Sequence, residues 1–76
     1  MVGNNSGYSL EPKNGKYQCA CCLDYTLDKI GNYEICQVCG WEDDDLQNED
    51  IDYAGGANEM SIRQARAAFK AGKPIR

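Results

Sequence analysis

Two short cysteine motifs decide the fold of this chain: Cys19-Ala20-Cys21-Cys22 and, after thirteen intervening residues, Cys36-Gln37-Val38-Cys39. Both sulfurs of a Cys-x-x-Cys pair can point at one centre, so two such pairs supply the four thiolates of a tetrahedral metal site. The chain has no histidine, so no imidazole competes with the thiolates as a ligand. The spacing predicts one metal ion held by Cys19, Cys22, Cys36 and Cys39.

The composition makes such an ion close to necessary for folding. Leu, Ile, Val and Phe number 12 of the 76 residues, below the share of roughly one fifth at which chains begin to lack a core. A chain of this length is also only marginally stable without disulfide bonds, a bound metal ion or another cross-link. A structural zinc site can contribute roughly 10–16 kcal/mol of apparent binding free energy to folding. We expect one structural zinc ion, with iron as the alternative because four thiolates suit both metals.

Disulfide bonds are the competing use of cysteines in a short chain. Secreted scaffolds have even numbers of cysteines, and here there are five. Residues 1–16 lack the apolar run of a signal peptide, and no apolar stretch reaches membrane-spanning length. We therefore expect a cytoplasmic protein whose cysteines remain reduced and bind metal, with no membrane contact.

Cys21 is the cysteine left outside the two pairs. It offers an alternative ligand, but only Cys19 and Cys22 have the standard two-residue gap. A reactive thiol needs a base or a cation to lower its pKa, and a negatively charged thiolate site has the opposite effect. We expect Cys21 to be a small side chain of the loop, with redox switching as the alternative. No general base, nucleophile pair or open metal position is visible, so the chain is not expected to be an enzyme.

Two predicted strands surround the cysteines, and residues 1–15 are predicted to be a flexible lead-in. Residues 25–27 and 33–35 contain β-branched and aromatic residues, and Gly31-Asn32 supplies a turn between them. These strands are predicted to form a β-hairpin, flanked by a first metal loop (residues 19–23) and a second metal loop (residues 36–41).

A helix is predicted over about residues 62–71. Ser61 and Gln64 form a capping-box pattern at its start, and Gly72 marks its end. Ile62 and Phe69 lie on its apolar face and are predicted to close over the metal unit. The predicted fold is a small metal-stabilised α+β domain over residues 16–76, of zinc-ribbon or rubredoxin-like type: a β-hairpin with two Cys-x-x-Cys loops, then an acidic loop and one C-terminal helix.

The acidic loop follows the second metal loop, with seven carboxylates and no base in residues 42–52. An acidic surface speeds association with a basic partner and can mimic nucleic acid, as in small proteins that neutralise nuclease toxins. We expect this segment to face solvent and to dock a basic protein. The expected contact residues are Trp41, Glu42, Asp43, Asp44, Asp45, Asp50, Asp52 and Tyr53.

A basic stripe, Arg63, Arg66 and Lys70, lies on the predicted helix. Such a stripe suggests phosphate contact, so a nucleic-acid-associated zinc ribbon is the alternative function, followed by an iron electron carrier. The formal net charge of −4 repels a polyanion at long range. We expect the bases to pair with the acidic loop within the fold, or to present half of a polarised interface. The sequence sets no oligomeric state.

The segment from Lys16 to Phe69 resembles the bacterial cysteine-rich CPCC family, small proteins named for their first cysteine cluster. Ala20 stands where the family has its proline, and Leu23 where glycine is common. The resemblance implies a small zinc-bound domain and brings no secure biochemical activity. The matching residues are Tyr17, Cys19-Ala20-Cys21-Cys22, Tyr25-Thr26-Leu27, Gly31, Tyr33-Glu34-Ile35-Cys36, Val38-Cys39, Trp41-Glu42-Asp43-Asp44, Gln47, Asp52-Tyr53, Gly55-Gly56-Ala57-Asn58, Ser61 and Ala65-Arg66.

Overall fold

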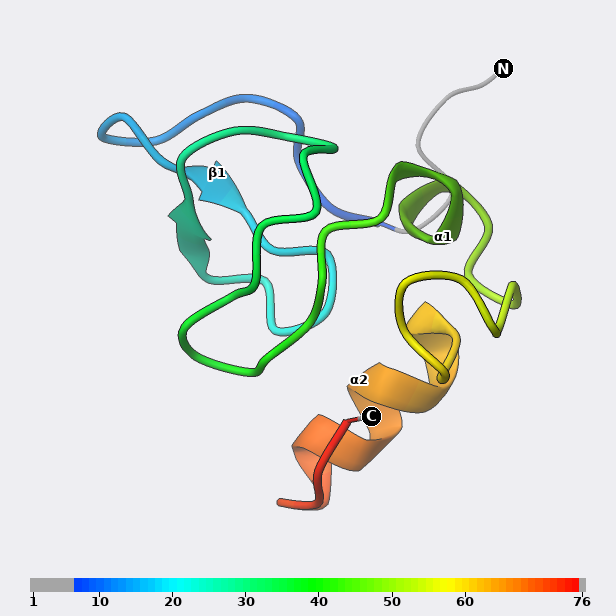
Figure 1. Ribbon diagram of the computed structural model, residues 1–76. Coiled ribbons are helices and arrows are strands. Elements are labelled where there is room, and N and C mark those ends of the chain that lie inside the picture. The colour runs from blue at the N-terminus through cyan, green and yellow to red at the C-terminus, as the bar shows by residue number, and fades with distance from the viewer. Residues whose placement is uncertain (1–6, 76) are drawn as a thin grey trace.

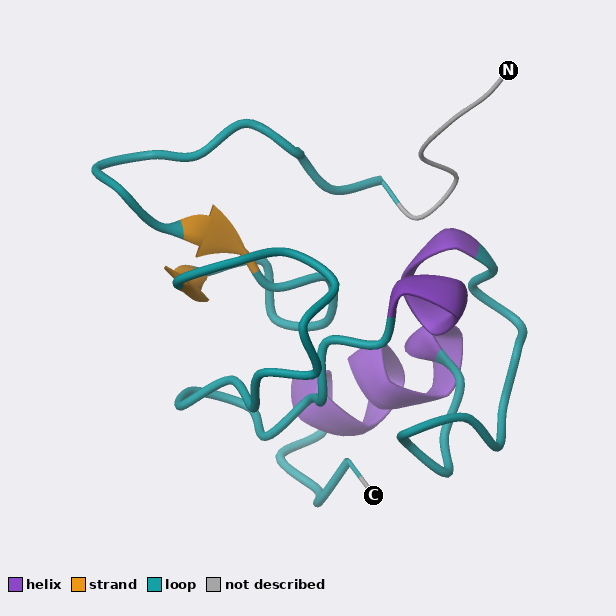
Figure 2. Ribbon diagram, turned by 45° about the horizontal axis from the view of Figure 1, so that its top comes forward, coloured by secondary structure: helices purple, strands orange, loops and turns teal. Residues whose placement is uncertain are grey.

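The computed structural model of the chain describes residues 7–75. Their elements, in order, are β1 (Tyr17–Gln18), β2 (Tyr25–Leu27), α1 (Asp45–Glu49) and α2 (Ile62–Lys70) (Figure 1). The strands lie on one side and the helices on the other, with long loops between them (Figure 2). Within residues 7–75, no helix combines the length and the apolar character needed to cross a membrane.

The two-stranded sheet is a hairpin, but its partners differ from the predicted ones. β2 pairs antiparallel with β1, with Tyr17 opposite Leu27, so the first metal loop is the hairpin connection. Pairing of residues 25–27 with residues 33–35 was a wrong prediction. Tyr33 has a φ of +57°, which an extended strand does not allow, and Ile35 forms only an isolated bridge with Glu42.

The lead-in predicted over residues 1–15 is structured in the part that is described; residues 1–6 lie outside the described residues. Lys13 and Lys16 exchange two backbone hydrogen bonds of 2.7 and 3.0 Å around Asn14-Gly15. Both turn residues have positive φ, which is the two-residue turn that Asn-Gly favours because its twist matches that of paired strands. Tyr8 is buried in the core, so the packed domain begins well before residue 16.

The first half of the acidic segment is buried, contrary to the prediction that it faces solvent. Trp41 is fully buried and Asp43 is 1% exposed, and Asp44 is also buried. The Trp41 indole donates to Asn48 Oδ1 at 3.0 Å, and Asn48 Nδ2 donates to Asp43 at 2.6 Å. The other Asp43 oxygen accepts the Gly31 N–H at 2.6 Å. These bonds satisfy a carboxylate whose burial raises its pKa.

The short helix α1, which the sequence did not predict, fixes the loop that follows it. Asp44 caps the helix by accepting the Leu46 N–H at 2.9 Å. Inside the fold, Gln47 Nε2 donates to the carbonyls of Tyr53, Asn58 and Met60 at 3.0–3.1 Å. Gln47 Oε1 accepts both the backbone and the side-chain N–H of Asn58. Among the described residues, no buried side-chain nitrogen or oxygen lacks a partner.

The C-terminal helix α2 confirms the predicted start. Ser61 and Gln64 form the full capping box, with both reciprocal hydrogen bonds present. Ile62 and Ala65 are fully buried on its inner side. Phe69, predicted to close over the metal unit, is instead exposed, and Ile75 enters the core after the chain turns back at Gly72.

Replacing Gln47 with Ala should destabilise the fold severely. The variant leaves several buried backbone groups without partners, each costing about 1–3 kcal/mol, so we expect a total loss of at least about 3 kcal/mol. For a domain this small, that loss lowers Tm by roughly 12 °C or more. Thermal unfolding of the metal-loaded protein measures it. Glu49→Ala, at an exposed position of the same helix, should shift Tm by little, and equal shifts in the two variants would contradict the role given to Gln47.

Candidate metal centre

The four predicted ligands converge on one point. The Cys19 and Cys39 sulfurs lie 3.6 Å apart, and the Cys22 and Cys36 sulfurs 3.7 Å apart. All four sulfurs lie within 4.8 Å of one another. Metal–sulfur bonds of about 2.3 Å in a tetrahedron give sulfur–sulfur edges of about 3.8 Å, so the cluster has nearly the dimensions of a four-thiolate site. The four cysteines can therefore bind a single metal ion.

The second metal loop holds its two sulfurs by backbone hydrogen bonds. Cys36 N–H donates to the Trp41 carbonyl at 2.9 Å, and Gly40 N–H donates to the Cys36 carbonyl at 2.9 Å. The Val38 and Trp41 N–H groups point at the Cys36 and Cys39 sulfurs, each at 3.4 Å. N–H groups directed at thiolates offset their negative charge and fix their orientation.

The first metal loop repeats this geometry with a less suitable residue. Leu23 N–H donates to the Cys19 carbonyl at 2.9 Å, as Gly40 does to Cys36. Leu23 and Gly40 both have left-handed backbones, with φ of +71° and +87°. Glycine adopts this conformation freely, whereas a residue with a Cβ is strained by roughly 1–2 kcal/mol. Leu23 therefore introduces local strain beside the site.

The helix α2 is tied to the first metal loop by Arg66. Its guanidinium donates from Nε and Nη2 to the Ala20 carbonyl, at 2.9 and 2.6 Å. Ala20 is fully buried, so this carbonyl has little access to water. Hydrogen bonds from a charged donor to a buried carbonyl are among the stronger ones, and here they link the metal loop with the C-terminal helix.

The cysteine thiols of the cluster are in contact, so the pKa of each depends on its neighbours. Contacts with the Cys19 and Cys21 thiols lower the pKa of Cys39, whereas donation to Cys36 and Cys39 raises the pKa of Cys19. Burial raises the pKa of Cys22 to about 12. Cysteine thiols must lose their protons to bind a metal ion. A divalent ion displaces them, which couples metal affinity to pH.

A family model described as cysteine-rich CPCC matches residues 17–72, from β1 to just past α2. The chain belongs to the cysteine-rich CPCC family. The matched segment contains all four converging cysteines together with Cys21. No curated protein matched this chain.

Cys21 of this CPCC protein lies beside the four-cysteine cluster and outside it. It is buried, and its thiol contacts Cys39, a contact that together with burial raises the pKa of Cys21. The preference for Cys19 and Cys22 as ligands agrees with the geometry, because these two, and not Cys21, join Cys36 and Cys39 in the group of suitable size.

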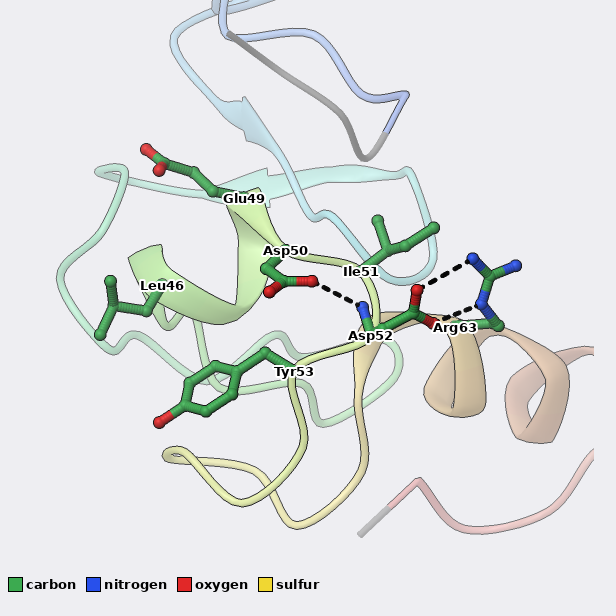
Figure 3. A pocket seen from close by; sticks show the side chains of 7 residues that line it. All are labelled: Leu46, Glu49, Asp50, Ile51, Asp52, Tyr53 and Arg63. Atoms are coloured by element: carbon green, nitrogen blue, oxygen red, sulfur yellow. Dashed lines mark hydrogen bonds and ion pairs between the residues drawn. The ribbon is translucent and has the colours of Figure 1, made fainter. Parts of the chain in front are cut away.

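The predicted partner-binding residues divide into two sets. Trp41, Asp43 and Asp44 are structural and buried, as described above, and Glu42 is half-buried with its backbone bonded to Asn58. The second set is exposed and, with Glu49 and Leu46, forms what we call the acidic surface: Asp45, Leu46, Glu49, Asp50, Asp52 and Tyr53. Most of it lines one hollow, which Arg63 borders (Figure 3).

The predicted basic stripe is largely engaged within the fold. Arg63 Nε lies 2.6 Å from Asp52 Oδ1, and this contact lowers the pKa of the exposed Asp52 carboxyl. Arg66 is bonded to Ala20, and Lys70 is exposed. The expectation that the helix bases pair with the acidic segment is met by Arg63, through Asp52, whereas Arg66 binds the Ala20 carbonyl of the first metal loop instead.

Sequence reasoning missed Gln47, Asn48 and Asn58, the side chains that organise the core network. One signal was present: Asp44 and Gln47 have the spacing of a capping box, as Ser61 and Gln64 do. A second was the Gly55-Gly56 pair, because adjacent glycines often mark a close approach of the backbone; a Cβ on Gly56 would lie 2.6 Å from the Asp44 carboxylate. That glycine allows the loop to approach α1 closely.

Removing the bound metal should unfold the domain. A strong chelator is expected to abolish the near-UV circular dichroism of Trp41, because its indole packs in the core beside the second metal loop. Adding one equivalent of metal ion to unbuffered apo-protein should release protons, and affinity should fall steadily from about pH 8 to about pH 5. An unchanged near-UV spectrum after metal loss, or a pH-independent affinity, would contradict a folding role for the ion.

Replacing Leu23 with Gly should stabilise the metal-loaded protein. The substitution removes the left-handed strain, and the greater freedom of glycine in the unfolded chain offsets part of the gain, so we expect up to about 1 kcal/mol. The reverse change, Gly40→Leu, should destabilise the equivalent position of the other loop. Thermal unfolding of both variants, with metal content checked, measures the effect; a lower Tm for Leu23→Gly would show that strain is not limiting there.

Proposed function

We propose that this CPCC protein is a non-enzymatic cytoplasmic interaction module, built around one structural zinc ion, whose acidic surface docks a basic protein. The observation that carries the proposal is Leu46, 65% exposed on α1 among the carboxylates of Asp45, Glu49 and Asp50. Tyr53, 40% exposed, lies across the same hollow (Figure 3). Apolar anchors within a charged rim are the arrangement that protein interfaces use.

The buried network supports this role by making the surface rigid. Gln47 and Asn48 hold α1 from inside, and Asp50 Oδ1 accepts the Asp52 N–H at 3.1 Å to shape the turn that follows. Docking to a preorganised surface loses less conformational entropy than docking to a flexible acidic loop. The carboxylates would also steer a basic partner during encounter. Inhibition of a basic nuclease toxin is the specific form of this function that we favour.

The alternatives have less support. Of the three bases of the predicted nucleic-acid stripe, Arg66 is bonded to the Ala20 carbonyl and Arg63 is paired with Asp52 at the surface, so the stripe does not present three bases free for phosphate. Four cysteine ligands leave no open position for a substrate, so catalysis at the metal is not favoured. Iron in the same ligands would make an electron carrier. Visible absorption of the purified protein separates the two metals, because zinc, a d¹⁰ ion, is colourless.

The test is affinity capture with the zinc-loaded protein in extracts of its own cells, followed by identification of the captured proteins. The wild type should retain a basic protein, and the double variant Glu49→Lys/Asp50→Lys should lose it. The control is Glu11→Lys/Glu59→Lys, which changes the net charge equally at exposed positions outside the acidic surface.

Purified partner and purified protein should then bind in a 1:1 titration, with a slower association rate at high salt. Leu46→Asp should weaken this binding at least tenfold if Leu46 is the anchor. Retention that survives the Glu49/Asp50 reversal, or that the control abolishes equally, would refute docking at the acidic surface.

A further inference from the structure

Two hollows that differ in charge lie beside the exposed side of α2, one near each end of the helix. Near its start, Arg63 borders the hollow of the acidic surface. Near its end lies a second hollow, mainly apolar, whose rim carries Lys70; we call it the cationic hollow. Leu23 and Phe69 line it with side chains that are 42% and 40% exposed, and no acidic residue is among its lining residues. An acidic region with an apolar anchor thus lies at one end of the helix, and an apolar hollow with a cation at the other.

Helix geometry places Arg63, from the first hollow, on the same side of α2 as Ala67 and Lys70, from the second. Arg63, Ala67 and Lys70 are spaced i, i+4 and i+7, so their side chains share one side of the helix. Ile62 and Ala65 occupy the buried side. At a rise of 1.5 Å per residue, Arg63 and Lys70 lie about 10 Å apart along the axis. Ala67, exposed and small, lies between them and permits close approach of another helix.

We propose that this side of α2 is the contact between two copies of the chain, packed antiparallel about a two-fold axis near Ala67. The acidic surface of each copy then faces the cationic hollow of the other. Leu46 inserts beside Leu23 and Phe69, and Glu49 pairs with Lys70. Because each contact is made twice, the assembly closes as a dimer.

Charge selects this arrangement over the other ways of pairing the same faces. A parallel arrangement would place the carboxylates of one copy against those of the other and leave both cationic hollows uncovered. The antiparallel arrangement joins unlike ends. Each chain carries a net charge of −4, so the two copies also repel at long range. Because this repulsion opposes the contact, we expect weak association, of the order of 100 µM in Kd.

This inference is independent of the proposed function, because its test uses the protein alone. The two are connected in one respect: the second copy covers the acidic surface, so a basic partner would have to displace it.

The experiment is sedimentation equilibrium of the zinc-loaded protein from about 10 µM to about 1 mM, a range that spans the expected Kd. Wild type should pass from monomer to dimer. Glu49→Lys and Lys70→Glu should each remain monomeric. An equimolar mixture of the two variants should dimerise again, because both contacts of the mixed pair join opposite charges. Glu11→Lys, a reversal outside both hollows, should dimerise like wild type.

Each other outcome overturns the proposal. A wild type that stays monomeric up to about 1 mM rules out the dimer at the expected strength. A dimer that tolerates both reversals uses another face, and species larger than a dimer indicate open head-to-tail association. Amide NMR shifts of the wild type provide a check that needs no variant: those that change with concentration should cluster at Leu23, Leu46, Ala67 and Lys70.

Discussion

The constraint on which the structure depends is the convergence of four sulfurs within 4.8 Å. Four thiolates at that separation repel one another, and only a cation among them turns the repulsion into a cross-link between the two loops. Both halves of the remaining chain are attached to those loops. Arg66 joins α2 to the first loop through Ala20, and Trp41 joins the second loop to Asn48 of α1. Both helices are therefore linked by hydrogen bonds to the loops that contain the metal ligands.

Buried hydrogen bonds fix much of the arrangement of this chain, as a large apolar core does in a larger domain. Within residues 7–75, few apolar side chains are fully buried, and Leu27, Trp41 and Ile62 are the largest of them. Gln47 instead orders a long loop by bonding to its backbone, and Asn58 ties that loop to the backbone of Glu42. A buried network in which every member is satisfied specifies one arrangement, because any other leaves donors unpaired at high cost. The chain thus gains a unique structure from few apolar residues.

Features set by residues close in sequence were predictable from the sequence. Strand pairing and the burial of single side chains, which depend on residues far apart in sequence, were not. The ligand set and the capping box of α2 depend on residues within a few positions of one another, so spacing revealed them. The predicted hairpin partner of β2 was wrong because the chain reverses between β1 and β2 through the first metal loop itself, whereas Gly31-Asn32 was taken as the hairpin turn on its composition. The burial of Asp43 depends on Gly31 and Asn48, and nothing in a run of carboxylates indicates which of them will find such partners. Helical periodicity likewise gave no sign that Phe69 would be exposed while Ile75, from beyond the helix, is buried in the core.

The anchoring of α1 from one side only has an evolutionary consequence. Gln47 and Asn48 make the internal contacts of the helix, while Asp45, Leu46 and Glu49 point to solvent and contribute little to its packing. Substitution at the outward positions therefore costs the fold little, whereas substitution at the inward ones disrupts it. A scaffold of this kind can change its recognition specificity rapidly under selection while its interior remains fixed. Divergence between relatives would then accumulate on one face of a five-residue helix.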